Sequence, residues 1–126
     1  MRKIINTANA PAPIGPYNQA VLSNDTLYLS GQIGLNPQSM EMVEGSVKEE
    51  AEQVMENLKA VLEAAEMTFS QVVKTSIFLS DMEDFSQVNE VYATFFNNYS
   101  SPARETIAVK TLPKNVKLEI SMIAVK

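Results

Sequence analysis

A long amphipathic helix is the feature of this sequence that most restricts the possible folds. Ser46 and Glu49 have the spacing of a capping box, in which each side chain can satisfy the other residue's free N–H group. Apolar residues then recur in steps of three and four, which places one apolar stripe along about five helical turns. The stripe consists of Val47, Ala51, Val54, Met55, Leu58, Val61, Leu62 and Ala65. On the outside of this predicted helix, Glu49, Glu50 and Glu52 are expected to form a solvated face.

Alternation of polar and apolar residues predicts strands on both sides of this helix. Residues 26–31 alternate in this way, and the turn residues Asn24 and Asp25 before them favour a hairpin with residues 20–22. The other predicted strands span residues 72–79, 104–109 and 116–125.

A second helix is expected after Asp84, which can act as its N-cap. Its predicted inner face consists of Phe85, Val88, Val91, Tyr92, Phe95, Phe96 and Tyr99. The resulting order of strands, helix, strand, helix and closing strands predicts an α+β fold, in which two helices cover one face of a mixed sheet. We expect a single domain over residues 1–126.

The last predicted strand has two different faces, because successive side chains of a strand point to opposite sides. Leu118, Ile120 and Met122 are expected to pack under the helices. The opposite face carries Lys117, Glu119 and Ser121. This second face begins polar, so it must meet solvent, a ligand or another subunit.

The chain contains no Cys and no His, which excludes several kinds of chemistry. Disulfides, zinc sites built from thiolate or imidazole, Ser-His-Asp triads and Cys-His dyads are all impossible. Catalysis must therefore use carboxylates, Lys, Arg, Tyr, hydroxyl groups, backbone dipoles and water. A metal site built only from carboxylates stays open at this point.

The charge of the chain argues against nucleic acid and anionic membranes as main partners. Ten basic and fifteen acidic residues give a net charge of −5, and the basic residues are dispersed. The N-terminus carries Arg2 and Lys3 but only Ile4 and Ile5 as an apolar segment, which is too short for a signal peptide. We therefore expect a cytoplasmic protein.

Arg104 and Glu119 are the two charged residues whose positions suggest a site. Arg104 begins a predicted strand, and its planar guanidinium is suited to a carboxylate or phosphate, although an exposed or ion-paired arginine would give the same pattern. Glu119 stands inside an otherwise apolar strand, where an unpaired charge is costly. It could serve as a general base or orient water, or it could form a structural ion pair with Lys117, Lys110 or Arg104.

Two further positions suggest a cleft. Tyr17 ends a proline-rich loop, where it could donate a hydrogen bond to a ligand or simply pack as an aromatic residue. Ser30 and Gly31 interrupt a predicted strand, and a glycine there marks either a close approach of the backbone to another group or a bulge.

Four motifs together resemble the Rid (YjgF-type) family of reactive-intermediate deaminases, in order and in approximate spacing. They are Ile14-Gly15-Pro16-Tyr17, Ser30-Gly31-Gln32-Ile33, Pro102-Ala103-Arg104, and Leu112-Pro113 followed by Leu118-Glu119-Ile120. The resemblance implies a chorismate-mutase-like α+β fold and a homotrimer with a ligand cleft at each subunit interface. It also implies hydrolysis of 2-imino or 2-aminoacrylate intermediates, released by pyridoxal-phosphate enzymes, to 2-keto acids and ammonia.

The resemblance also implies roles for particular residues. Arg104 corresponds to the family's carboxylate-binding arginine, Glu119 to its water-positioning glutamate, and Tyr17 to its cleft tyrosine. Ser30 and Gly31 correspond to the strand end that lines the ligand. The hydrolysis implied in this way needs no metal or organic cofactor.

The other two residues implied by the resemblance are Asn89, at the edge of the cleft, and Thr106, in the substrate-binding set. Thr106 stands where family members often have Cys, and strand alternation places it on the face of Arg104, with Glu105 on the opposite face. A backbone role for this position would tolerate threonine, whereas a role for the thiol would not.

Two other functions remain as alternatives to a deaminase. The chain could be a non-catalytic trimer that binds or senses small carboxylates, in which case Arg104 would matter and Glu119 would not. It could also be an endoribonuclease, a function that the acidic charge and the absence of histidine disfavour.

Overall fold

The predicted hairpin and the later strands join in one six-stranded sheet, which the computed structural model describes over residues 1–126. Its strands are β1 (Arg2–Ile5), β2 (Ala20–Ser23), β3 (Thr26–Gln32), β4 (Val72–Leu79), β5 (Ala103–Ala108) and β6 (Leu118–Val125). They lie in the order β1-β2-β3-β6-β4-β5, and all neighbours are antiparallel except β4 and β5. Because β5 is parallel to β4, the sheet is mixed, as predicted.

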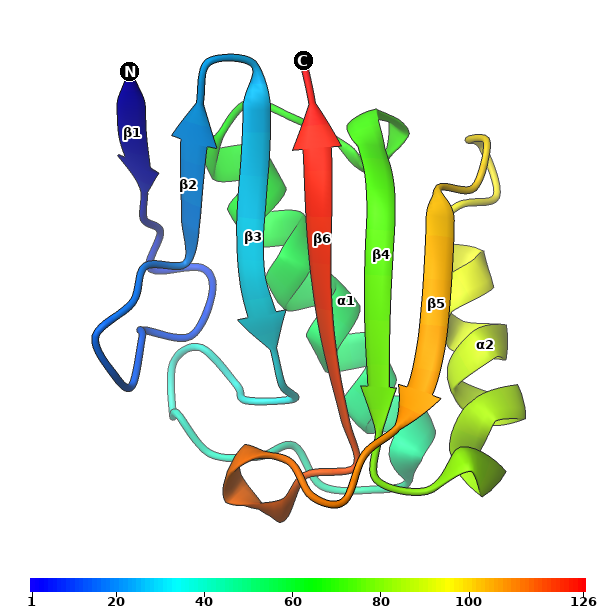
Figure 1. Cartoon of the computed structure of the whole chain (residues 1–126). Helices are drawn as coiled ribbons and strands as arrows, with labels where there is room; N and C mark the ends of the chain where they lie inside the picture. Colours follow the sequence, from blue (N-terminus) through cyan, green and yellow to red (C-terminus); the bar gives the residue numbers. More distant parts are fainter.

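Two helices lie on the same face of this sheet. They are α1 (Val47–Ala64) and α2 (Phe85–Thr94), and the other face of the sheet is uncovered (Figure 1). Short 3-10 turns η1 (Phe69–Gln71), η2 (Met82–Asp84) and η3 (Pro113–Asn115) lie in the connections. The observed layers confirm the predicted α+β arrangement. Neither helix is both long enough and apolar enough to cross a bilayer.

The strand β1 is absent from the sequence-based expectations. Its residues include only the short apolar pair Ile4 and Ile5, which shows no alternation of useful length. The strand forms because β2 offers an edge, with Ile5 opposite Ala20, and Ile5 is buried. Pairing across the sheet therefore decides this element.

Helix α1 begins after Ser46 and covers the core with the predicted stripe, but the Ser46 hydroxyl donates to the Glu49 carboxylate instead of accepting from the Glu49 N–H as the capping box requires. The hydroxyl of its N-cap Ser46 accepts a hydrogen bond from the N–H of Lys48. Val54, Met55 and Leu58 are fully buried. The expectation of a solvated face is wrong for Glu50, which is only 8% exposed. Its carboxylate accepts hydrogen bonds from the main-chain N–H groups of Lys117 and Leu118, at the start of β6.

Helix α2 differs from its prediction at both ends. Asp84 occupies the N-cap position but makes no side-chain capping bond, while Asp81 accepts from the N–H of Glu83 in the preceding turn. Phe85 and Tyr99, both predicted on the inner face, are 38% and 40% exposed. The helix ends at Thr94, so helical periodicity no longer directs Tyr99 inward, whereas Val88, Tyr92 and Phe96 are buried as predicted.

The two faces of β6 separate as expected from alternation. Leu118, Ile120 and Met122 are buried beneath the helices. The uncovered face of the sheet exposes large apolar side chains, among them Tyr28 at 51% and Val73 at 49%. Apolar area of this kind on a sheet face is typical of an interaction surface.

Candidate functional site

Glu119 and Gly31 meet on the uncovered side of the sheet. The pairing of β3 with β6 shifts register between Leu29 and Gln32, so the backbone bulges at Ser30 and Gly31. A Cβ atom on Gly31 would lie 2.7 Å from the carboxyl carbon of Glu119. The interrupted strand thus contains a bulge and also brings backbone close to another group. Glycine is needed there because it leaves room for the Glu119 side chain.

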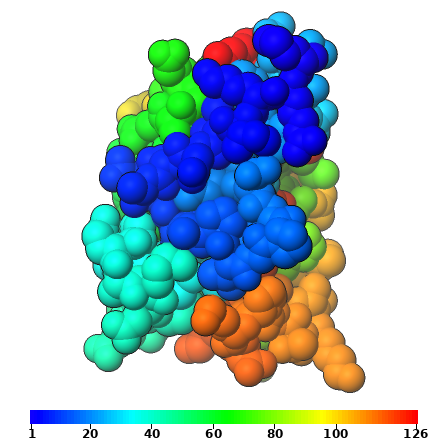
Figure 2. Space-filling view, turned by 90° about the vertical axis from the view of Figure 1, so that its left-hand side faces the viewer, coloured from blue at the N-terminus to red at the C-terminus, as the bar shows by residue number.

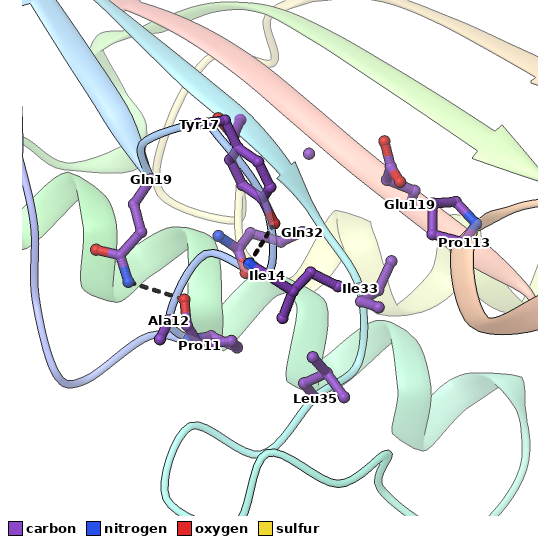
Figure 3. A pocket seen from close by; sticks show the side chains of 12 residues that line it. Pro11, Ala12, Ile14, Tyr17, Gln19, Gln32, Ile33, Leu35, Pro113 and Glu119 are labelled. Atoms are coloured by element: carbon purple, nitrogen blue, oxygen red, sulfur yellow. Dashed lines mark hydrogen bonds between the residues drawn. The ribbon is translucent and has the colours of Figure 1, made fainter.

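Tyr17 lies on the opposite wall of the same cavity. The cavity has a volume of about 450 Å³, and Tyr17, Ser30, Gly31 and Glu119 all line it. Figure 3 shows Tyr17 and Glu119 on different segments around this space, with Ile14 and Ile33 between them. Three of the sequence motifs therefore converge on one cavity, as the resemblance implies.

The loop before β2 holds Tyr17 in an open position. Tyr17 is 45% exposed, so it is not a packed core aromatic. Its hydroxyl accepts a hydrogen bond from the N–H of Ile14, with 3.4 Å between N and Oη. A phenol can accept and donate at once, so this hydroxyl can still donate its proton to a ligand.

The hydroxyl of Ser30 is already committed within the chain. It donates a hydrogen bond to the carbonyl of Asn18, and the N–H of Ser30 donates to the carbonyl of Gln19 at 2.9 Å. Ser30 therefore fastens the loop to β3, and toward a ligand its hydroxyl can act only as an acceptor.

Glu119 has no ion-pair partner within the chain. The ion pairs of the structure join Lys48 to Glu90 and Lys74 to Glu105, so the predicted alternative of a structural pair for Glu119 is wrong here. Burial raises the pKa of the Glu119 carboxyl above its ordinary value, because desolvation disfavours the charged form. An unpaired carboxylate with a raised pKa is a stronger base, which suits a group that activates water.

The cavity wall also has an apolar part, of which the sequence motifs included Ile14, Ile33 and Pro113 but not Pro11 or Leu35. Figure 2 shows the N-terminal segment in blue, the loop after β3 in cyan and the segment before β6 in orange, side by side over this edge. Apolar residues in loops carry no periodic signal, so only the fold brings them together.

Gln19 is a second residue that the sequence-based analysis missed. It is 2% exposed, and its amide nitrogen donates to the carbonyls of Thr7, Ala10 and Pro11. Its amide oxygen accepts from the N–H of Thr7 at 2.7 Å. This single side chain holds the loop that carries Tyr17. A polar residue beside a predicted strand start was the only signal available for it.

Arg104 lies apart from this cavity, on the face that the helices cover. Its guanidinium donates a hydrogen bond to Oδ1 of Asn89 on α2 at 2.9 Å. The guanidinium carbon also lies 5.0 Å from the centre of the Tyr92 ring and 5.7 Å from that of Phe85. Arg104 is thus neither freely exposed nor ion-paired, and its planar group is held by one hydrogen bond and two aromatic faces.

Asn89 and Arg104 line a second cavity of about 540 Å³, together with Tyr92, Phe96 and Pro102. Thr106 lies two positions along β5, on the same side of the strand as Arg104, as alternation predicts. Its hydroxyl oxygen is buried and has no hydrogen-bond partner. A buried hydroxyl without a hydrogen-bond partner costs stability.

Glu105 points the other way, as expected. It forms an ion pair with Lys74 at 3.0 Å and accepts a hydrogen bond from the Ser76 hydroxyl. These bonds lower the pKa of the Glu105 carboxyl, the Ser76 hydroxyl being the largest cause. Glu105 is therefore occupied on the open face and takes no part in the arginine cavity.

Arg104 and Glu119 cannot hold the same small molecule within one chain. They project from opposite faces of the sheet, and β4 lies between their strands, which separates the backbones by about 10 Å. Thr75 pairs with both Arg104 and Met122, and Glu119 lies three residues before Met122 on β6. The structure contains both halves of the predicted constellation, but it does not bring them together.

The chain has no thiol or imidazole nucleophile. No group of three acidic side chains converges in the structure. The chemistry available is a donor fork at Arg104, a carboxylate at Glu119 and a phenol at Tyr17. These groups can bind a small carboxylate and direct a water molecule.

Comparison with known proteins gives consistent matches over the full chain. The model of a family described as Endoribonuclease L-PSP matches residues 7–126. The 2-iminobutanoate/2-iminopropanoate deaminase of Mus musculus is 50% identical over 126 residues, covering 100% of this chain and 93% of the mouse protein.

Solved structures match equally well. The Rid-family protein YyfA from Yersinia pestis superposes with a TM-score of 0.97 at 43% identity, covering 100% of both chains. E. coli TdcF with bound serine has a TM-score of 0.95 at 41% identity, covering 98% of each chain. The fold expected from the resemblance is confirmed.

Proposed function

This chain belongs to the Rid (YjgF, L-PSP) family, and from that premise we propose that its two half-sites together hydrolyse 2-imino acids to 2-keto acids and ammonia. The substrate class is that of 2-iminobutanoate/2-iminopropanoate deaminases, to which relatives of about half identity over the full chain belong. The observation that carries the proposal is the pair of half-sites itself. One offers a fork for a carboxylate, and the other offers an unpaired carboxylate of raised pKa.

The chemistry follows from the structure of a 2-imino acid. Its carboxylate lies next to an electrophilic C=N carbon, so a bidentate contact with Arg104 fixes the position of that carbon. The oxygen of a water molecule attacks this carbon, and Glu119 accepts a proton from that water molecule. The resulting carbinolamine takes up a proton on nitrogen and collapses, and the C–N bond breaks to release ammonia and a 2-keto acid.

Tyr17 and Gly31 complete the glutamate half of the site. The Tyr17 hydroxyl keeps a proton that it can donate to the nitrogen or to the water. Gly31 lets backbone reach the same space without a side chain. No metal or organic cofactor takes part in this scheme. A substrate made by pyridoxal-phosphate enzymes would be met in the cytoplasm.

The proposed site needs more than one copy of the chain. Because Arg104 and Glu119 lie on opposite faces of one sheet, a small substrate can contact both only if they come from different subunits. The uncovered face exposes Tyr28, Val73 and Ile107 at about half of their area, which gives an apolar surface for such an association. We propose a homotrimer with shared sites, in agreement with the expectation from the sequence motifs.

The decisive assay measures imine hydrolysis while a second enzyme generates the imine in the same solution. Threonine dehydratase with threonine generates 2-iminobutanoate, and the protein should speed the release of 2-ketobutyrate and ammonia above the rate in buffer. The relative with bound serine makes a non-catalytic binding protein the second candidate. Calorimetric binding of 2-ketobutyrate without any acceleration of imine hydrolysis would show that this candidate is correct.

Shared sites can be tested by mixing two inactive variants. Arg104→Lys and Glu119→Gln would be coexpressed with different tags, and mixed oligomers purified on both tags. In each mixed trimer one of the three sites then combines an intact Arg104 with an intact Glu119, which restores up to about a third of the wild-type rate. A mixture no more active than either variant alone would contradict sharing, while leaving the deaminase activity of the wild-type protein intact. Light scattering should give about three times the 13.9 kDa of the chain.

The proposal does not extend to RNA cleavage, despite the description of the family model. The chain has a net charge of −5 and no histidine. Neither cavity gathers basic residues, since Arg104 is the only one that lines either of them. The electrostatic attraction that dominates RNA binding is therefore weak here.

A further inference from the structure

A row of polar side chains runs through the otherwise apolar inner face of α1. Glu50, Gln53 and Asn57 are spaced by three and four residues, so they share one side of the helix. Glu50 is 8% exposed and Asn57 is fully buried. Polar groups in such places cost stability unless they are hydrogen-bonded, so their partners show what they hold.

Asn57 holds the loop that follows β3. Its amide nitrogen donates to the carbonyl of Ile33 at 3.1 Å and to the carbonyl of Leu35 at 3.0 Å. Its amide oxygen accepts from Nε2 of Gln53 at 2.8 Å, which fixes the orientation of the amide. Ile33 and Leu35 both line the Glu119 cavity. One side chain of α1 therefore sets the position of that wall.

Glu50 holds the segment that leads into β6. One carboxylate oxygen accepts from the N–H of Lys117 at 2.8 Å and from that of Leu118 at 3.2 Å. These are the two residues directly before Glu119. Glu50 also lies against Gly34, where a Cβ atom would come within 2.8 Å of its Cγ. The same side chain thus contacts the loop after β3 and the strand that carries Glu119.

We propose that Glu50 and Asn57 are positioning residues for the imine hydrolysis, because they fix the gap between the backbone at Gly31 and the carboxylate of Glu119. This inference rests on the proposed function. Apolar side chains of similar size could fill the same space with comparable stability. Unlike apolar packing, a hydrogen bond is directional, so each of these bonds fixes the position of one backbone group beside the gap.

The test compares two substitutions at position 50. Glu50→Met keeps the volume and removes both acceptors, whereas Glu50→Gln keeps an amide oxygen that can accept from the same N–H groups. Glu50→Met should lower kcat by about tenfold or more, since a displacement of about 1 Å at a reacting group costs up to 10² in rate. KM should stay within about twofold, because Arg104 binds the carboxylate elsewhere. Glu50→Gln should return kcat to within about threefold of wild type.

The matched control is Glu52→Met, which deletes an exposed carboxylate two positions away on the same helix. It should leave kcat and KM unchanged. Amide hydrogen exchange of Lys117 and Leu118 reports the bonds directly, and protection should be lost in Glu50→Met and kept in Glu50→Gln. A purely structural role would change the melting temperature of Glu50→Met but leave its kcat equal to wild type when measured well below that temperature.

Three results would overturn the inference while the deaminase activity stands. They are a wild-type kcat in Glu50→Met, an equal loss of kcat in Glu50→Met and Glu50→Gln, and a rise in KM alone.

If Glu50→Met does not fold, Glu50→Asp takes its place, since it keeps the charge but cannot reach both N–H groups. Glu50→Asp should lower kcat at unchanged KM, and a wild-type kcat with exchange protection lost at Leu118 would overturn the inference. A wild-type protein that does not accelerate imine hydrolysis would instead overturn the proposed function.

Discussion

Arg104 and Glu119 lie on opposite faces of one sheet and in opposite surroundings. On the covered face, Arg104 is held by Asn89 and lies over two aromatic rings. On the uncovered face, Glu119 has no ion pair and no hydrogen-bond partner in the chain, and burial alone raises its pKa. The first arrangement fixes a charged group in one orientation. The second leaves a charged group unsatisfied and therefore reactive.

The difference matches what binding and catalysis require. A carboxylate is recognised best by a fork that is already oriented, because less conformational entropy is lost on binding. A base works best when nothing neutralises it and when its pKa lies closer to the working pH. The covered face provides the first condition through packing, and the uncovered face provides the second because no group of the same chain pairs with Glu119.

The largest effect is expected from Glu119→Gln, which keeps the shape of the side chain but removes the base. Hydrolysis of 2-iminobutanoate should slow by a factor of about 10² or more. Affinity for 2-ketobutyrate should stay nearly unchanged, because Arg104 provides the carboxylate contact. The coupled assay and calorimetric titration on one preparation measure both.

Glu56→Gln, an exposed position on α1, is the matched control for this substitution and should behave as wild type. Undiminished hydrolysis by Glu119→Gln would exclude Glu119 from the mechanism and would remove the proposed contrast between the two faces.

The next effect is expected from Arg104→Lys, which keeps the charge and loses the planar fork. Lysine cannot make the bidentate contact, and each hydrogen bond to a charged group is worth about 1.5–3 kcal/mol. Binding of 2-ketobutyrate should therefore weaken at least about tenfold, as calorimetry would show. Affinity equal to wild type would exclude Arg104 as the residue that binds the carboxylate of 2-ketobutyrate.

A smaller effect is expected from pH, through the raised pKa of Glu119. Only the ionised carboxylate can accept a proton, so kcat/KM should fall as pH decreases, with a midpoint above the ordinary 4.5 of glutamate. The pH profile of the wild-type protein measures this midpoint. A midpoint at or below 4.5 would contradict the burial that the structure shows.

The same raised pKa predicts that the folded state loses stability over the pH range in which activity rises. Ionising Glu119 is harder in the folded than in the unfolded chain, so the folded state loses stability as pH rises from the ordinary pKa through the raised one. Glu119→Gln should thus melt slightly higher than wild type near neutral pH. The difference should vanish below the ordinary pKa of glutamate.

The smallest effect is expected from Thr106→Val, which removes a buried hydroxyl that has no partner in the chain. Stability should stay the same or rise by about 1 kcal/mol, since no hydrogen bond is lost. If the hydroxyl contacts the ligand, affinity for 2-ketobutyrate should fall about threefold, and we expect this result. Unchanged affinity would leave Thr106 outside the arginine half of the site.

Local periodicity was enough to predict most of the fold. The stripe on α1, the alternation of β4 and β6 and the turn before β3 each depend on neighbours in the sequence, and each was found close to its predicted bounds. The sequence failed where a partner strand or a chain end decides the outcome. β1 exists because β2 has a free edge, and Tyr99 is exposed because α2 ends before it.

The site divides in the same way. The sequence by itself excluded thiol and imidazole chemistry, because the chain has no Cys and no His, and its motifs, which resemble those of one family, indicated Arg104, Glu119 and Tyr17 as candidates. Only the tertiary structure decided that Tyr17, Gly31 and Glu119 share a cavity, that Arg104 lies on the other face, and that Glu50 holds the strand before Glu119. The physical reason is that side-chain alternation can be read along one strand, whereas the distance between two strands and the hydrogen bonds of a buried carboxylate depend on how the sheet and helices pack.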